Sequence, residues 1–153
     1  MVRGETAVVQ AAAGRKRTAP TVSALSEAGT GYHPMVAYPT HHVHEAVISL
    51  ADGTDPQAVG AAVTTELCGA AEHDGPCRWP HNTAVVPGDE ATVFRTVFIA
   101  EQSEEREVRR RIRSALRSSD QWDVTSDRTR SLTPDERGLA ARLARRAQAG
   151  DQS

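Results

Sequence analysis

The chain has 153 residues, of which 39% are hydrophobic and 25% charged, and its formal net charge is −2 at pH 7. This length suits one compact domain with additional terminal segments. So small a net charge gives no global field that would draw the chain to nucleic acid or to an anionic membrane. No apolar run approaches the ~20 residues of a membrane-spanning helix, and the N-terminus lacks the apolar stretch of a secretory signal. These features predict a cytoplasmic protein.

The first segment, residues 1–39, is rich in Ala, Gly, Thr, Ser and Pro and shows no sustained hydrophobic period. Such a segment has too little apolar surface to offset the entropy that it would lose on folding. We therefore predict a disordered N-terminal tail, with order beginning near Thr40.

A strand and a helix are expected to open the folded domain. Residues 41–51 alternate in polarity, with Val43 and Val47 on one side, and this pattern predicts a strand. A helix is expected over residues 56–71, because a proline suits its first position and apolar residues recur at helical spacing. The apolar stripe of this helix comprises Val59, Ala62, Val63, Leu67 and Ala70.

Two strands, a second helix and a further strand are expected next. Strands are predicted over residues 82–86 and 91–100, joined by the turn sequence PGDE. Glutamates come early and arginines late in residues 104–117, a distribution that suits the dipole of a helix. Residues 121–126 alternate again and indicate a fourth strand.

The predicted order is thus βαββαβ, the order of a ferredoxin-like α+β sandwich, over residues 40–127. Residues 128–153 are predicted to add an amphipathic helix, which the capping sequence TPDE begins. Its apolar stripe, mainly alanine with Leu139 and Leu143, is too thin for a stable isolated helix. We therefore expect this helix to dock on the domain, to bind a protein partner or to form a homodimer interface.

The stretch ELCGAAEHDGPCRWPHN, residues 66–82, contains both cysteines of the chain. Cys68, His73, Cys77 and His81 follow the spacing C-x4-H-x3-C-x3-H, and two thiolates with two imidazoles form a normal tetrahedral zinc set. The spacing differs from that of a standard zinc finger. Three readings stay open, namely a zinc site, thiols and histidines without a ligand, and a Cys68–Cys77 disulfide.

The predicted topology brings two further histidines into the hypothesis. In a ferredoxin-like sandwich, the connection over residues 68–81 returns to the end of the sheet where the first strand begins. His42 and His44 lie on that strand and alternate onto one of its sides. We therefore expect residues 68–81 to face the His42–His44 edge. His42 and His44 are for this reason further candidate ligands.

No P-loop, dinucleotide-binding glycine motif, zinc-protease motif or nucleophile elbow is present. Catalytic residues are therefore left unassigned. Phe94 and Phe98 alternate like the base-stacking aromatics of RNA-binding sheets, but the accompanying signature is absent, which disfavours nucleic acid as a partner. The sequence favours a non-catalytic binding or regulatory domain with a structural zinc site. The alternatives are a small Cys/His-based or metal-dependent enzyme and a dimeric interaction module without metal.

Overall fold

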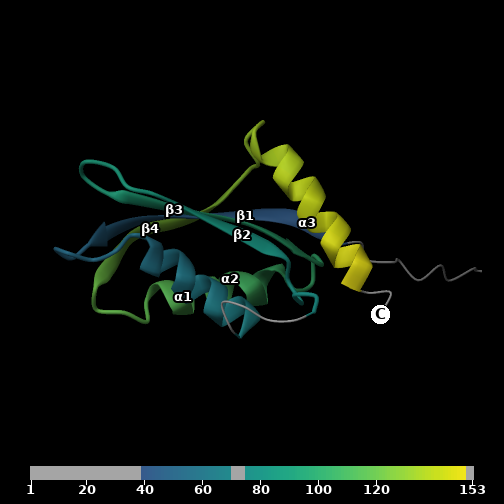
Figure 1. Cartoon of the computed structure of the whole chain (residues 1–153), viewed down its shortest axis with the longest axis horizontal. Helices are drawn as coiled ribbons and strands as arrows, with labels where there is room; N and C mark the ends of the chain where they lie inside the picture. Colours follow the sequence, from purple (N-terminus) through teal and green to yellow (C-terminus); the bar gives the residue numbers. More distant parts are fainter. Residues whose placement is uncertain (1–38, 70–74, 151–153) are drawn as a thin grey trace, which may run out of the picture. The chain divides into compact units, whose positions relative to one another are not determined.

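The structure is a computed structural model, and it describes residues 39–69 and 75–150 (Figure 1). The elements in chain order are β1 (Thr40–Leu50), α1 (Gln57–Cys68), β2 (His81–Val86), β3 (Thr92–Ala100), α2 (Glu105–Leu116), β4 (Trp122–Arg130) and α3 (Glu136–Gly150). This order confirms the predicted α+β fold of ferredoxin-like type with an extra helix at its end. Apart from Pro39, the predicted N-terminal tail lies outside the described residues.

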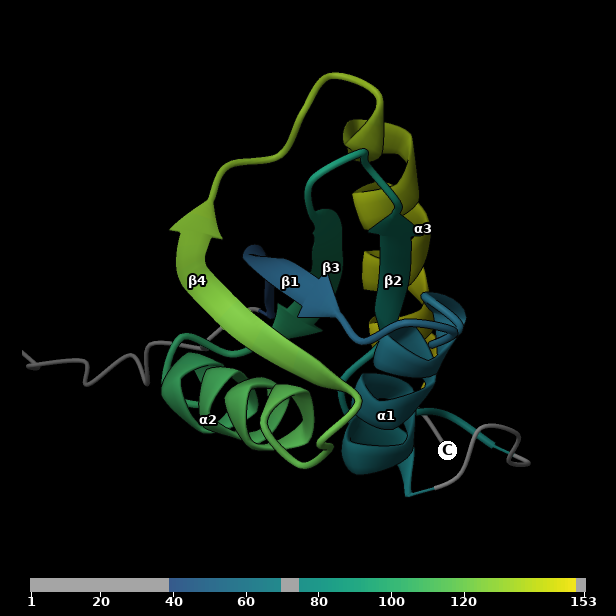
Figure 2. The same ribbon diagram turned by 90° about the vertical axis from the view of Figure 1, so that its left-hand side faces the viewer.

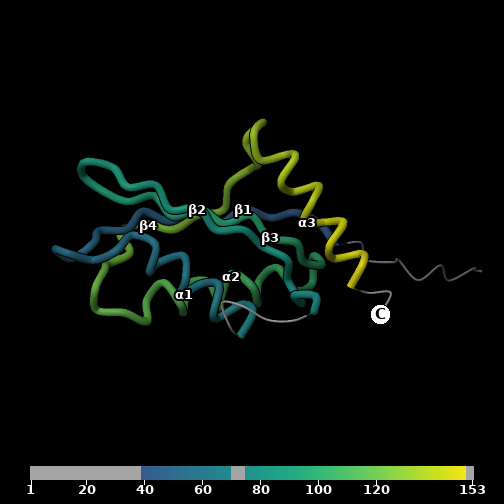
Figure 3. Tube along the Cα trace, in the orientation of Figure 1, coloured from purple at the N-terminus to yellow at the C-terminus, as the bar shows by residue number. Residues whose placement is uncertain are grey.

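The four strands form one antiparallel sheet in the order β2-β3-β1-β4. Because β3 runs antiparallel to both of its neighbours, β1 and β2 begin at the same end of the sheet, as the Cα trace shows (Figure 3). At that end, Phe98 of β3 pairs with His42 of β1 on one side and with His81 of β2 on the other. The expected end of the sheet is therefore confirmed, but a strand separates the two histidines.

Helices cover both faces of the sheet. The first two helices lie against one face and α3 lies against the other (Figures 1 and 2). The larger core fills the space beneath α1 and α2, where Phe94 and Phe98 are fully buried. The smaller core lies beneath α3 and consists of Val43, Val97, Ile99, Ala140 and Leu143. No helix in the described part of the chain is both long and apolar enough to cross a membrane.

Local sequence sets where α1 begins, packs and ends. The Asp55 carboxylate accepts a hydrogen bond from the backbone N–H of Gln57 at 2.9 Å. Midway along the helix, Gly60 lies so close to β2 that an added Cβ would be 3.1 Å from Thr83 Oγ1. Gly69 takes a left-handed conformation with φ 79° and ends the helix. The helix is therefore shorter than the predicted 56–71, and Cys68 is its last residue.

Charged side chains connect β4 to its neighbour β1 and the start of α3 to β3. β4 extends to Arg130, beyond the predicted 121–126, and the Glu45 carboxylate of β1 accepts hydrogen bonds from Arg128 and Arg130. Glu136 accepts a hydrogen bond from the backbone N–H of Thr133 at 2.8 Å, which confirms the predicted capping interaction. The same carboxylate pairs with Arg95 of β3 and so ties the start of α3 to the sheet.

Candidate metal centre

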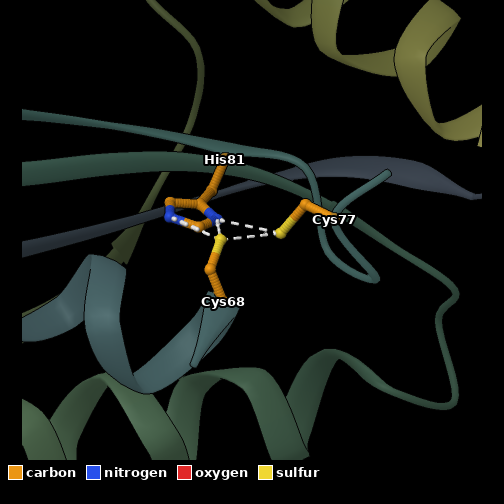
Figure 4. A group of neighbouring side chains, drawn as sticks. All are labelled: Cys68, Cys77 and His81. Atoms are coloured by element: carbon orange, nitrogen blue, oxygen red, sulfur yellow. Dashed lines mark hydrogen bonds between the residues drawn. The ribbon is translucent and has the colours of Figure 1, made fainter. Parts of the chain in front are cut away.

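Three of the predicted ligands converge at the β2 edge of the sheet. Cys68 is the last residue of α1, Cys77 lies in the connection that follows, and His81 is the first residue of β2. One ligand atom from each of these half-buried residues lies within 4.8 Å of the other two (Figure 4). The three side chains can therefore hold a metal ion, and we call them the Cys/His centre.

The distances within the Cys/His centre are close to those of a coordination shell. The Cys68 sulfur lies 3.9 Å from both ring nitrogens of His81, and the Cys77 sulfur lies 3.9 Å from Nδ1. Ligand atoms around a tetrahedral zinc ion are separated by roughly 3.5–3.8 Å. The two sulfur atoms are closer, at 2.9 Å, and both cysteines are free thiols. Zinc binding would move the sulfurs apart by about 1 Å, and disulfide formation would draw them together by a similar amount.

A hydrogen bond orients the imidazole of His81. Its Nδ1 donates to the backbone carbonyl of Trp79 at 2.8 Å. With the proton on Nδ1, the lone pair is on Nε2, which lies 3.9 Å from the Cys68 sulfur. Metal-binding histidines almost always donate their second ring N–H to a carbonyl or carboxylate in this way. This tautomer leaves Nε2 as the nitrogen that can bind a metal, whereas Nδ1 is the ring nitrogen that lies 3.9 Å from both sulfurs.

The segment that carries Cys77 is anchored to the domain by the residues after it. The Trp79 side chain is only 3% exposed and belongs to the larger core. The guanidinium of Arg78 lies 4.6 Å from the Trp79 ring and pairs with Glu104 at 2.8 Å. Pro80 accepts a backbone hydrogen bond from Ile99, which extends the sheet ladder toward the Cys/His centre. Contacts of the protein itself thus hold Cys77 near β2.

The proton affinities of the three side chains differ. Burial would raise the pKa of Cys77, but hydrogen bonds with His81, with Cys68 and with a backbone carbonyl outweigh it and lower this pKa. Burial, together with the neighbouring thiol, raises the pKa of Cys68. Burial would lower the pKa of His81, but the contacts with Cys77 and with the Trp79 carbonyl raise it. One thiolate therefore forms readily, and formation of the second requires compensating positive charge, such as that of a metal ion.

A cavity of about 620 Å³ opens beside the Cys/His centre. Both cysteines and His81 line it, and the C-terminal half of α3 forms another wall. The other described residues of the lining are Thr64, Gly75, Pro76, Pro80, Leu143, Arg146, Ala149 and Gly150. The cavity therefore connects the candidate ligands to solvent and to one cationic side chain.

His42 lies outside the Cys/His centre. Its Nε2 contacts the Ala100 carbonyl at 3.3 Å, its Nδ1 lies 3.5 Å from the Glu105 carboxylate, and its ring stacks on Phe98 at 5.1 Å. Burial lowers the pKa of His42, although Glu105 opposes this effect. Both ring nitrogens thus have partners that the protein itself supplies.

His44 is also placed elsewhere and is fully buried. Its Nδ1 lies 3.5 Å from the Arg109 guanidinium, and its Nε2 has no hydrogen-bond partner among the described residues. Burial lowers the pKa of His44 to about 4, although the Asp127 carboxylate opposes this effect. His44 is therefore a neutral core residue near pH 7.

The sheet explains why the structure does not bring His42 and His44 into the centre. Both histidines lie on one side of β1, as expected, and contact α2, but β3 separates β1 from β2. Two strand spacings amount to roughly 10 Å, and the Phe98 ring fills the interval between His42 and His81. The fourth predicted loop ligand, His73, lies outside the described residues.

Two functional features were not anticipated from the sequence. Arg109, which is 6% exposed, donates to the Val43 carbonyl at 2.9 Å and to Glu105 at 2.7 Å. It stands in a run of arginines, and only its position beside Val108 and Ile112 on the helix could have suggested burial. Arg146 lines the cavity, and its spacing of three from Leu143 was the available signal.

No family model, no curated protein and no solved structure matches the chain. The Cys/His centre is the one group of three or more Cys, His, Asp or Glu side chains placed to hold a metal ion within residues 39–69 and 75–150. The function is therefore inferred from this centre and the cavity beside it.

Proposed function

We propose that the protein is a small binding or regulatory domain that holds a zinc-class ion between Cys68, Cys77 and His81. The observation that carries this proposal is the convergence of two thiols on an imidazole whose Nδ1 already donates to the Trp79 carbonyl. Thiolate and imidazole ligands together favour zinc over hard cations such as magnesium or calcium.

In this proposal the ion joins the end of α1 to the start of β2. It compensates the charge of the second thiolate and closes the connection over residues 69–80. Because the ion binds the folded chain in preference to the unfolded chain, its binding free energy adds to the stability of the fold. A reducing compartment such as the cytoplasm would keep both thiols available. The fourth ligand is His73, as predicted from the sequence, or a molecule from solution.

A metal-dependent enzyme is the second candidate. Catalytic zinc ions typically have three protein ligands and one open position, and the cavity of about 620 Å³ adjoins the three described ligands. A protein partner or a homodimer through α3 stays a prediction. The apolar stripe of α3 packs on the sheet of its own chain, so that such an interface would use its outer face. Sedimentation equilibrium of the purified protein measures self-association directly.

The proposal is tested by cobalt binding under reducing conditions. Metal-free protein titrated with Co²⁺ should develop the thiolate-to-cobalt absorption of a two-cysteine site at one equivalent, and Zn²⁺ should displace the cobalt. Cys68→Ser, Cys77→Ser and His81→Gln should each weaken binding by about 100-fold or more, since loss of a residue that only supports a ligand already costs 10–100-fold. His41→Gln, an exposed histidine on β1, is the matched control.

Two results would contradict the zinc proposal. One is equal cobalt affinity in wild type and the three ligand variants. The other is the absence of free thiols in protein that is purified without reductant and without exposure to oxidant. That result would favour the Cys68–Cys77 disulfide. His73→Gln then distinguishes the two sources of the fourth ligand. The substitution should weaken cobalt binding if His73 is the fourth ligand and leave it unchanged if a molecule from solution is.

A further inference from the structure

The cavity beside the Cys/His centre has the size of a small-molecule site. Its volume of about 620 Å³ lies within the roughly 300–1,000 Å³ that such sites occupy. Pro76, Pro80 and Leu143 supply apolar surface, and Thr64 supplies a hydroxyl group. Polar surface makes up nearly half of the lining, and polar groups within a pocket orient a ligand.

The charges around the cavity indicate the sign of its ligand. Arg146 is the one formally charged side chain among the described lining residues, and none of these residues is acidic. Within the described part of the chain, Arg146 forms no ion pair. A zinc ion with two thiolates has no net charge, so that the described lining residues would then carry one net positive charge, that of Arg146. An anionic ligand is therefore favoured.

The end of α3 is built to bring Arg146 to this place. Leu143, which is 2% exposed, fixes the helix on the sheet one turn earlier. One turn later, Gly150 meets the connection before β2 so closely that an added Cβ would lie 2.7 Å from the Pro76 ring. A larger residue than glycine would push the helix away from Pro76. The backbone at Arg146 is thus held between two fixed contacts, and its exposed side chain lines the wall that α3 contributes.

We propose that this cavity binds a small organic carboxylate, with one end of the ligand at the metal and the other end near Arg146. One carboxylate oxygen takes the fourth position of the metal, which is the alternative in which a molecule from solution and not His73 is the fourth ligand. This inference rests on the proposed function, because it uses the metal as one of two anchors. A guanidinium offers a carboxylate two parallel N–H donors. A dicarboxylate would occupy both anchors, whereas acetate would occupy one.

The test uses the cobalt-loaded full chain with succinate, acetate, inorganic phosphate and the uncharged acetamide as probes. Succinate should change the visible bands of the cobalt saturably and bind more tightly than acetate, while acetamide should have no effect. Arg146→Gln should weaken succinate binding by about tenfold, the loss expected for a hydrogen bond to a charged group. Arg145→Gln removes an exposed arginine from the same helix that does not line the cavity and should leave binding unchanged.

Each other outcome overturns a defined part of the inference. If the cobalt bands form but no anion changes them, the ligand site fails and the metal centre stands. If phosphate binds and succinate does not, the carboxylate assignment is wrong. Equal losses in Arg146→Gln and Arg145→Gln would remove the role of Arg146. If the thiolate-to-cobalt bands never appear, the proposed metal centre fails, and the ligand site fails with it.

Discussion

On the sheet face that α1 and α2 cover, histidines lie on the strands to either side of β3. The histidines of β1 and the histidine of β2 differ in what surrounds their ring nitrogens. On the β1 side, His42 and His44 lie among the charged groups of α2, including Glu105 and Arg109. On the β2 side, His81 lies beside two thiols and a cavity, and no described charged side chain is within hydrogen-bonding distance of it. The same residue type therefore has different roles within one layer of the fold.

The difference shows how a structural histidine can be told from a candidate ligand. A buried histidine such as His42 has both ring nitrogens facing groups of its own chain, and neither nitrogen faces a second candidate ligand. His81 has one nitrogen occupied by a carbonyl, and its other nitrogen lies 3.9 Å from the Cys68 sulfur. We expect the β1 side to govern stability and its dependence on pH, and the β2 side to govern metal binding.

The largest effect is expected from Arg109→Leu on the β1 side. The substitution removes the side-chain donor of the Val43 carbonyl and one of the donors of the Glu105 carboxylate, which keeps its hydrogen bond from Gln102. Breaking a buried ion pair costs about 3 kcal/mol or more of unfolding free energy, and for this partly buried pair we expect a loss of about 3 kcal/mol. Urea denaturation measures this loss. Arg106→Leu, at an exposed position on the same helix, is the control. Cobalt affinity should be unchanged, and a large loss of affinity would show that the two sides are coupled.

Zinc removal should have the next largest effect, and it should act through the β2 side. At free zinc of about 100 times Kd, binding stabilises the fold by about 2.7 kcal/mol. A chelator should remove this contribution, and it should do so more readily at mildly acidic pH, because protons compete for the thiolates and for His81 with its raised pKa. Denaturation of Cys68→Ser should be insensitive to the chelator; equal sensitivity would contradict the assignment.

A smaller, pH-dependent effect is expected from His44. Its pKa of about 4 in the folded chain lies below the unfolded value of 6.5, so that the unfolded state binds more protons between these pH values. Its contribution to stability is therefore complete above pH 6.5 and declines as pH falls toward 4. Between pH 7.5 and 5.5 the decline is about 1.4 kcal/mol. Comparison of wild type with His44→Gln in chelator isolates this difference; parallel pH profiles would refute it.

The smallest effect is expected from His42→Gln. Because the Phe98 strand lies between His42 and the Cys/His centre, cobalt affinity should stay within about twofold of wild type, as for independent sites. Isothermal titration gives the two affinities. A loss as large as that of His81→Gln would place His42 in the coordination shell and erase the distinction between the two sides of β3.

Much of the fold was predictable because hydrophobic period and turn residues agree along this chain. The order of elements follows from strands such as residues 91–100 and from the capped start of α3. The boundaries were less predictable. Gly69 ends α1 before the predicted residue 71. This end was not predicted, because nothing in the composition distinguishes a glycine that ends a helix from one that a helix tolerates. β4 runs on through polar residues because Glu45 binds its arginines, a long-range partnership that periodicity does not reveal.

The candidate site was predictable only in part. Proximity in the chain and return to the same end of the sheet correctly brought Cys68, Cys77 and His81 together. Element order alone gives the end of the sheet at which a residue lies, whereas strand order decides which residues are neighbours across the sheet. His42 shares the end with His81 but lies across β3 from it. Arg146 reaches the cavity through the packing of α3 on the opposite face, which no local pattern describes.

The cover that α3 places over Val43, Val97 and Ile99 has a consequence for synthesis of the chain. All four strands are complete at Arg130, but the residues that shield this sheet face come from residues 136–150. During translation, the nascent sheet therefore displays an apolar face until the last helix has left the ribosome, and exposed surface of this kind is prone to association. A stalled or truncated product that ends between Arg130 and Glu136 should engage chaperones, whereas the metal ligands, all made by residue 81, would already be present.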